Sequence, residues 1–138
     1  MSGAPQYLLV LYLVEQADSD PVAPGVVADA LDRSPAATTE MLQRLAARGL
    51  VTHEPYEGAT LTPDGREDAE ELYETYVTLS RFFDEVLGLD DADEEAMRLA
   101  GNVSPVVADR LATSLLEDRD TASEDTVARP SFLRVNKR

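Results

Sequence analysis

The stretch that decides the fold is residues 25–49, GVVADALDRSPAATTEMLQRLAARG. Its first part spaces its apolar side chains as a short helix would. Ser34 and Pro35 then supply a hydroxyl N-cap and a proline at the first helical position, which begin a second helix. That helix is expected to run to about Arg48, and Gly49 is typical of a helix end. The stretch therefore predicts two helices separated by a short turn.

A β-hairpin and a long helix are predicted directly after this pair. Residues 50–54 and 59–62 alternate as two strands joined by a turn. Thr62 then caps a long helix that is expected to reach Leu87. The apolar positions of this helix recur three and four residues apart and form a heptad seam, which suits either a dimer interface or packing within the chain. The seam residues are Ala69, Leu72, Tyr76, Leu79, Phe83 and Val86.

Further helices are predicted on both sides. Residues 6–16 are expected to form a buried first helix, and residues 93–100 and 105–116 two shorter ones. The last segment has few large apolar residues and is expected to be poorly ordered. The fold class is therefore mainly α with a small β-hairpin. The expected division is a winged helix-turn-helix domain at 1–65, a helical domain at 66–117 that carries the seam, and a flexible tail at 118–138.

The order of these elements is typical of a winged helix-turn-helix, whose later helix enters the major groove of DNA. Small side chains at the start of that helix let its backbone approach the bases, and alanine or threonine methyl groups can contact thymine. A glutamate there can accept a hydrogen bond from cytosine. The predicted base-facing residues are Ser34, Ala36, Ala37, Thr38, Thr39 and Glu40, and the predicted backbone contacts are Arg44, Arg48 and Tyr56.

Other interpretations of these residues stay open. Glu40 precedes Arg44 by four positions, so an ion pair along the helix also explains both residues. Winged-helix units also serve as protein-interaction modules that bind no DNA. His53 is interpreted as a solvated or DNA-proximal side chain rather than a metal ligand, because its neighbour Glu54 points to the opposite face of the strand.

The charge balance argues at first against nucleic acid, because phosphate contacts need cations. The 138 residues include 27 acidic and 12 basic side chains, a net charge of −15. Residues 1–66 carry four cations and nine anions (−5), the rest eight and eighteen (−10), and residues 35–49 come to +1. The acidic, lysine-poor composition is typical of a salt-adapted protein from a halophile, and an ordinary acidic protein is the alternative. We therefore expect DNA binding that depends little on phosphate charge.

Several classes are excluded by composition. With no Cys and one His, the chain can build no disulfide, cysteine-based zinc site or Cys nucleophile. No Ser-His-acid arrangement or glycine-rich phosphate loop can be recognised, so an enzyme is not expected. The longest apolar run, residues 7–14, is far shorter than the roughly 20 residues of a membrane span. We expect a cytoplasmic protein without a membrane partner.

Six segments carry more specific motifs: residues 7–13, 27–31, 34–45, 49–51, 54–65 and 82–89. Together they resemble the diphtheria-toxin-repressor family of iron-dependent, metal-sensing regulators, and the likeness covers residues 6–116. Length and order fit the short members that lack a C-terminal SH3-like domain. The resemblance implies a homodimer that binds a palindromic double-stranded DNA operator, repressor activity, and a dimer core after the wing, where the heptad seam lies.

The resemblance also implies metal sensing, and here the chain departs from the family. Family members respond to Fe(II) or Mn(II), ions that prefer carboxylate oxygen and imidazole. The wing also differs, because Glu57 stands where family members often place a cation. We therefore predict that the metal switch is lost and that no cofactor is bound; the alternative is a metal-responsive repressor with relocated ligands. The family's ligand positions fall on Gln6, Leu9, Val77 or a neighbour, Met97, Ala100 and Gly101.

Overall fold

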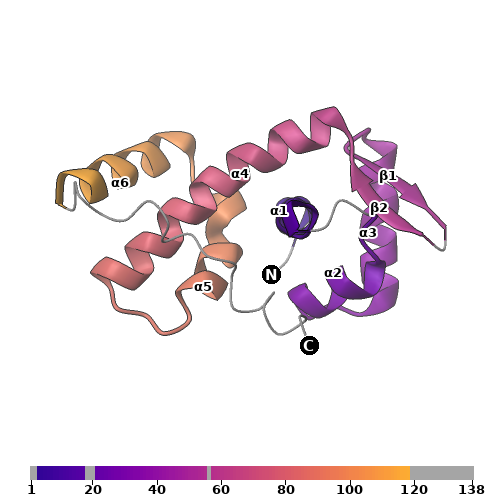
Figure 1. Cartoon of the computed structure of the whole chain (residues 1–138), viewed down its shortest axis with the longest axis horizontal. Coiled ribbons are helices and arrows are strands. Elements are labelled where there is room, and N and C mark those ends of the chain that lie inside the picture. Colours follow the sequence, from indigo (N-terminus) through magenta and orange to yellow (C-terminus); the bar gives the residue numbers. More distant parts are fainter. Residues whose placement is uncertain (1–2, 18–20, 56, 119–138) are drawn as a thin grey trace. The chain divides into compact units, whose positions relative to one another are not determined.

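The computed structural model describes residues 3–17, 21–55 and 57–118 (Figure 1). The chain divides into two compact units, Met1–Tyr73 and Glu74–Arg138. The division falls inside a helix rather than after residue 65, where the sequence places the domain boundary. The predicted tail lies outside the described residues from 119 onward. The mainly helical fold class with one antiparallel hairpin is confirmed.

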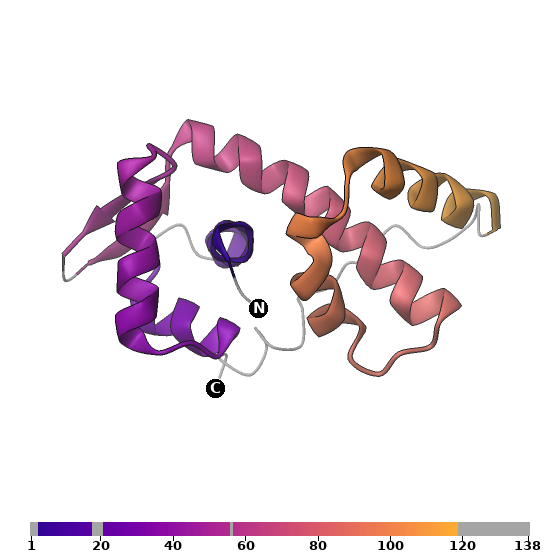
Figure 2. The same cartoon turned by 180° about the vertical axis from the view of Figure 1, so that it is seen from behind.

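The first unit is built around helix α1 (Ala4–Ala17), which contacts α2 (Pro24–Leu31), α3 (Pro35–Ala47) and strand β2 (Gly58–Leu61). Figure 1 and Figure 2 look down the axis of α1 from opposite ends. The helix carries apolar side chains on nearly every side, and the surrounding elements bury them by covering several of its faces. Its buried apolar side chains are Tyr7, Leu8, Leu9, Val10, Leu11 and Leu13.

The turn between α2 and α3 is held by backbone hydrogen bonds and a side-chain cap. Asp32 adopts a left-handed conformation with φ 55°, and the Arg33 N–H donates to the Ala28 carbonyl at 2.9 Å. Ser34 Oγ then accepts from the Ala37 N–H at 3.1 Å, and proline follows at the first helical position. The cap satisfies a backbone donor that the first turn of a helix leaves unpaired.

The hairpin pairs β1 (Val51–Glu54) with β2 in antiparallel register, with His53 opposite Ala59. An isolated bridge between Val22 and Ala59 ties the segment before α2 to the same sheet. Gly58 has φ 126°, and a Cβ at this position would collide with the Val22 carbonyl. Only glycine fits there without strain.

The link from the hairpin to α4 (Pro63–Arg81) uses both threonine and glycine. Thr62 Oγ1 accepts from the Gly65 N–H at 3.0 Å and donates to the Gly49 carbonyl at 2.7 Å. A Cβ on Gly65 would meet the Leu50 carbonyl oxygen far inside contact distance. The Leu-Thr-Pro-x-Gly segment therefore fixes where α4 begins relative to the residues directly before β1.

The second unit contains the end of α4, the π-helix η1 (Phe82–Val86), α5 (Ala92–Leu99), the short η2 (Ala100–Asn102) and α6 (Pro105–Asp118). The two shorter helices match the predicted ones. The long helix expected to reach Leu87 continues to Val86, but its last turn is a π turn, because the Leu87 N–H donates to the Phe82 carbonyl, five residues back, at 3.2 Å.

The π turn changes what the heptad seam can do. It adds a residue to one turn, so positions beyond Arg81 rotate away from the line of the preceding helix. Val86 is 51% exposed, whereas the seam residues Ala69, Tyr76 and Leu79 are buried within the chain itself. Those three side chains have no surface left for a second copy, so the seam as a whole is not the dimer interface that the sequence predicts. Leu72 and Phe83 are half-buried.

Candidate nucleic-acid interface

Helix α3 presents one face to the core and the opposite face to solvent. Thr38, Leu42 and Leu45 are buried, as the helical spacing of three and four requires. Ala36 and Glu40 are exposed, and Ala37 and Thr39 are half-buried. The prediction that Thr38 faces DNA bases is therefore wrong, because its side chain is fully buried under the helix. Threonine is small enough to fill a core position where its methyl group packs.

The charged residues of α3 lie on its solvent side. Glu40 and Arg44 approach to 3.9 Å, with side chains that are 69% and 67% exposed. A pair so exposed and so long contributes little to stability. Both groups therefore remain available to a ligand, which is compatible with contacts to DNA and with an ion pair along the helix. Arg48, at the end of the helix, is exposed as well.

Ser34 and the hairpin tip complete the predicted surface. Ser34 is exposed, and its oxygen caps α3, so its hydroxyl proton stays free to be donated. Tyr56 lies outside the described residues. Glu57, the next residue of the turn, is exposed.

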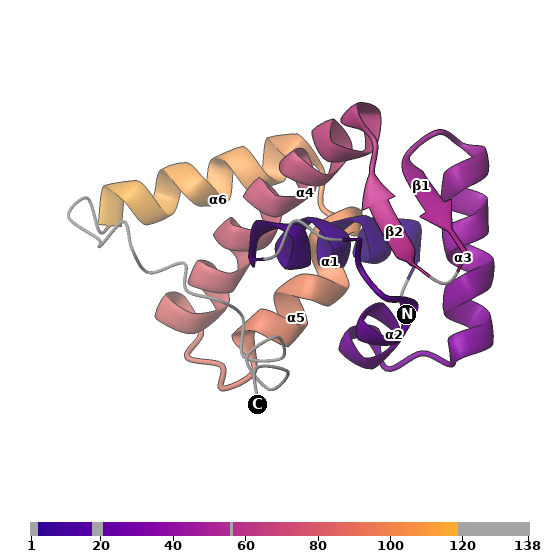
Figure 3. The ribbon, with the colours of Figure 1, turned by 45° about the vertical axis from the view of Figure 1, so that its right-hand side comes forward.

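A cleft between α3 and the hairpin was not predicted from the sequence. Its volume is about 630 Å³, and Figure 3 shows α3 and β1 side by side. Thr39, Gln43 and Ala46 lie one helical turn apart and form one wall, and His53 belongs to the opposite wall. The spacing of these α3 residues is visible in the sequence, but the facing strand is not. The lining residues are Pro24, Thr39, Gln43, Ala46, His53 and Pro55.

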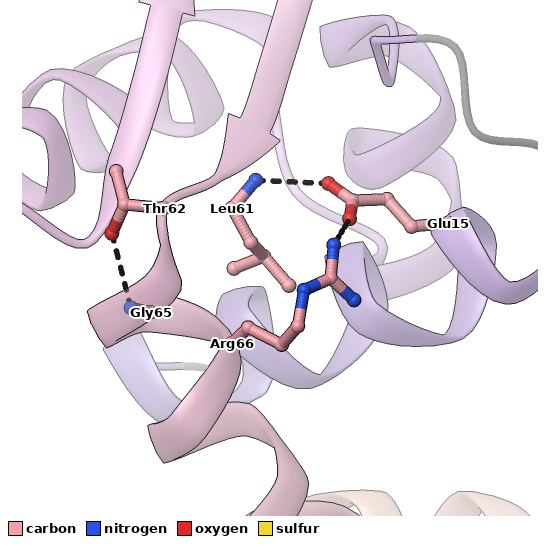
Figure 4. A network of polar contacts seen from close by, with 5 residues as sticks. All are labelled: Glu15, Leu61, Thr62, Gly65 and Arg66. Carbon is pink, nitrogen blue, oxygen red and sulfur yellow. Dashed lines mark hydrogen bonds and ion pairs between the residues drawn. The ribbon is translucent and has the colours of Figure 1, made fainter.

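A buried carboxylate ties the hairpin to α1 (Figure 4). The Glu15 side chain is 4% exposed; one oxygen accepts from the Leu61 N–H at 2.9 Å, and the other from Arg66 Nη2 at 2.7 Å. The end of β2 and the start of α4 are thereby bound to the end of α1. Charge-assisted hydrogen bonds of this kind are shorter and stronger than neutral ones.

The residues at the family's metal positions do not fit a hard cation. Leu9, Met97 and Ala100 are buried, and their side chains offer no oxygen or imidazole nitrogen. Gln6 is also buried, and its Oε1 accepts from the Gly3 N–H at 2.9 Å. Val77 and Gly101 likewise have no donor atom in their side chains. Within residues 3–17, 21–55 and 57–118, no group of three or more His, Cys, Asp or Glu side chains is placed to hold a metal.

A capped turn, an exposed second helix and an adjacent hairpin define the winged helix-turn-helix class of DNA-binding domains. Residues 1–59 match the iron dependent repressor N-terminal DNA binding domain. Residues 62–121 match the metal binding and dimerisation domain of the same family. The chain belongs to the iron dependent repressor family, and its relatives are transcriptional regulators, not enzymes.

Relatives and solved structures agree with this assignment. An uncharacterized HTH-type transcriptional regulator of Methanocaldococcus jannaschii is 34% identical over 116 residues, 83% of this chain and 93% of the relative. The structure of the manganese regulator SloR superposes with a TM-score of 0.72 at 26% identity, over 83% of this chain and 54% of that one. A manganese-dependent transcriptional repressor in complex with manganese superposes with a TM-score of 0.74 at 29% identity, over 82% of this chain and 52% of that one. This chain thus spans about half the length of these solved structures.

Among the described helices, none combines the length and apolar character needed to cross a membrane.

Proposed function

We propose that the chain is a homodimeric regulator that acts in the cytoplasm by binding a palindromic DNA operator through α3 and the hairpin. The observation that carries this proposal is the solvent face of α3, where small side chains lie beside accessible Glu40 and Arg44. Small residues permit close approach of the helix to base edges. The proposed contacts are Ser34, Ala36, Ala37, Thr39 and Glu40 to bases, and Arg44, Arg48 and Tyr56 to the backbone.

The second copy is proposed to bind the C-terminal unit. The large apolar side chains that the described residues leave exposed are Val86, Leu87, Leu99, Val106 and Val107. Exposed apolar surface of this kind marks interaction sites. A two-fold dimer would place the two α3 helices on half-sites one or more DNA turns apart.

DNA binding is tested by Ala37→Glu, measured on operator fragments recovered by genomic footprinting. A glutamate three residues after Ser34 completes a capping box, so the helix is preserved while a negative charge enters the DNA-facing surface. We expect at least a tenfold loss of affinity, with the dimer intact. Asn102→Glu adds the same charge at an exposed position of η2 and is the control. A wild-type dimer that binds no duplex would favour the protein-interaction module instead.

The metal switch of the family is proposed to be absent from this chain. The buried side chains at Leu9, Met97 and Ala100 support this, because Leu9 and Ala100 have no donor atom and the thioether of Met97 is a soft donor that does not suit Fe(II) or Mn(II). The test is calorimetry with Mn(II) and Fe(II), together with operator binding with and without chelator. Stoichiometric micromolar metal binding that tightens operator affinity would instead establish a metal-responsive repressor with relocated ligands.

Weak dependence on salt is proposed to accompany the acidic composition. If Arg44 and Arg48 of each protomer supply the phosphate contacts, four contacts give a slope of log affinity on log salt of about −3.6. A slope near −10 would show that many more cations take part. A protein adapted to growth of its source organism in high salt should still bind the operator at high salt. An ordinary acidic protein should bind the operator only at low salt.

A further inference from the structure

The cleft between α3 and the hairpin stands apart from the acidic remainder of the molecule. The chain has 27 acidic residues, yet none of those that the structure describes lines this cleft. Three of its lining residues, Thr39, Gln43 and His53, can donate hydrogen bonds through a hydroxyl, an amide and an imidazole. In an acidic protein, a concave surface that carries three donors among apolar residues and no carboxylate is suited to an anion.

We propose that this cleft holds a phosphate group of the DNA backbone, and that protonated His53 strengthens the contact as pH falls. The proposal rests on the proposed function, since α3 must lie in the major groove for the DNA strand to reach the cleft. The strand that leaves the major groove beside α3 would pass between Gln43 and His53 toward the hairpin. Histidine is the side chain that gains its charge between pH 8 and 5, and charge-assisted hydrogen bonds to phosphate are about twice as strong as neutral ones.

The charged groups on the elements around His53 do not line the cleft. On β1, Glu54 follows it and points to the other face of the strand, and Glu57 lies in the hairpin turn. On α3, Glu40 and Arg44 lie on the neighbouring stripe and are paired with each other. On α2, Asp29 is exposed and does not line the cleft. His53 is therefore the one ionisable side chain among the six lining residues.

The test is operator affinity at pH 5.5 and pH 8.0 for the wild-type dimer and two variants. We expect the wild type to bind about tenfold more tightly at pH 5.5, a difference of about 1.4 kcal/mol. His53→Gln keeps a neutral donor and should lose this dependence. His53→Lys carries a permanent charge and should bind tightly at both pH values. Carboxylates that titrate elsewhere affect all three proteins alike and cancel in the comparison.

Salt dependence gives a second readout that a merely structural role for His53 would not change. Each phosphate contact made by a cation steepens the slope of log affinity on log salt by about 0.9. The slope for the wild type should therefore steepen by about 1.8 between pH 8.0 and 5.5, because a dimer has two His53 side chains. The slope for His53→Gln should not change between these pH values. Gln43→Ala should weaken binding severalfold at both pH values, because it removes a neutral donor.

Failure of the cleft assignment and failure of the proposed function give different results. If the wild type binds no duplex at either pH, the proposed function fails. If it binds with the same pH dependence as His53→Gln, only the assignment of the cleft fails. Inorganic phosphate is the remaining probe: saturable binding that shifts the His53 ring resonances but leaves duplex affinity unchanged would assign the cleft to free phosphate and overturn the proposal.

Discussion

The two units of the chain handle their apolar side chains in opposite ways. The unit Met1–Tyr73 encloses its large apolar residues around α1, whereas the five that the described residues leave exposed all lie between Val86 and Val107 in the second unit. Burying apolar surface is the main favourable term in association as in folding. The difference is consistent with the proposal that a second copy binds the second unit.

The polar contacts follow the same contrast. In the first unit, Glu15 joins the end of α1 to residues 46 and 51 positions further along the chain. In the second, the described ion pairs Arg81–Glu85 and Arg98–Glu95 join residues three or four positions apart. Long-range contacts fix elements relative to one another, whereas local pairs support only single helical segments. The first unit should therefore be the more rigid scaffold.

The largest effect should come from Gly65→Ala, which breaks the first unit where the hairpin meets α4. The added Cβ collides with the Leu50 carbonyl, a backbone atom that cannot move alone, so we expect a loss of about 3 kcal/mol in the free energy of unfolding. Urea denaturation followed by circular dichroism measures it. Gly25→Ala is the control, since nothing lies within 4 Å of its Cβ, and it should be neutral or stabilise by about 0.5 kcal/mol. Equal effects would mean that the close approach at Gly65 is not required.

The second effect tests the long-range contact. Glu15→Ala leaves the Leu61 N–H without its acceptor and releases Arg66, so we expect a loss of about 2 kcal/mol in the free energy of unfolding. Arg66 is 41% exposed and can be solvated, which limits the cost. Glu40→Ala removes a carboxylate from an exposed pair and should change stability by less than about 0.5 kcal/mol. Equal free energies of unfolding for Glu15→Ala and Glu40→Ala would mean that the contacts of Glu15 do not stabilise the first unit.

These same residues explain how much of the fold could be predicted. Ser34 before a proline and the Thr62 cap are local signals, so the helix starts in the first unit were predictable. The π turn at Phe82 leaves no trace in the sequence, because the heptad spacing continues through residues that no longer lie on one face. Gly58 is recognisable in the sequence only as a turn residue, since its contact with Val22 depends on the tertiary structure.

The candidate site was predictable to a similar extent. The exposed positions of α3 follow from its periodicity, but Thr38 contradicts the prediction because a polar side chain in a helix need not face outward. The cleft cannot be found from the sequence because it needs Gln43 and His53, which lie on different elements. The position of His53 in the hairpin indicates proximity to DNA but not the helix it faces. Local pattern therefore predicts which face of a helix is exposed, and only packing shows which element stands opposite it.

The third effect addresses the second unit. Val106 is 65% exposed on α6, and Val106→Asp places a charge on the apolar surface proposed to bind a second copy. We expect the dimer dissociation constant to rise about tenfold, about 1.4 kcal/mol, with little change in the fold of the monomer. Analytical ultracentrifugation measures the association, and Asn102→Asp is the matched charge control. A dimer unaffected by Val106→Asp would place the interface elsewhere on the unit.

The smallest effect concerns the tyrosine pair at the end of the first unit. The Tyr12 and Tyr73 rings lie 5.3 Å apart at 49°, and burial raises the pKa of the Tyr73 hydroxyl above 10.0, with Tyr12 adding to the shift. The unfolded chain releases this proton first as pH rises, so the folded state binds more protons above pH 10. Its stability is therefore fully present below that pH and falls as pH rises toward the folded pKa.

Tyr73→Phe should flatten this alkaline decline in the free energy of unfolding, measured by urea denaturation between pH 9 and 11. The change in slope should be less than that of one full proton, about 1.4 kcal/mol per pH unit, because the side chain is only half-buried. The matched control is Tyr12→Phe, which removes the charge that Tyr12 acquires but leaves Tyr73 to titrate. It should keep most of the decline, because burial is the larger cause of the raised Tyr73 pKa. An unchanged slope in Tyr73→Phe would mean that the pair is as solvated as an exposed tyrosine, and the first unit would then be less closed at its end than at its core.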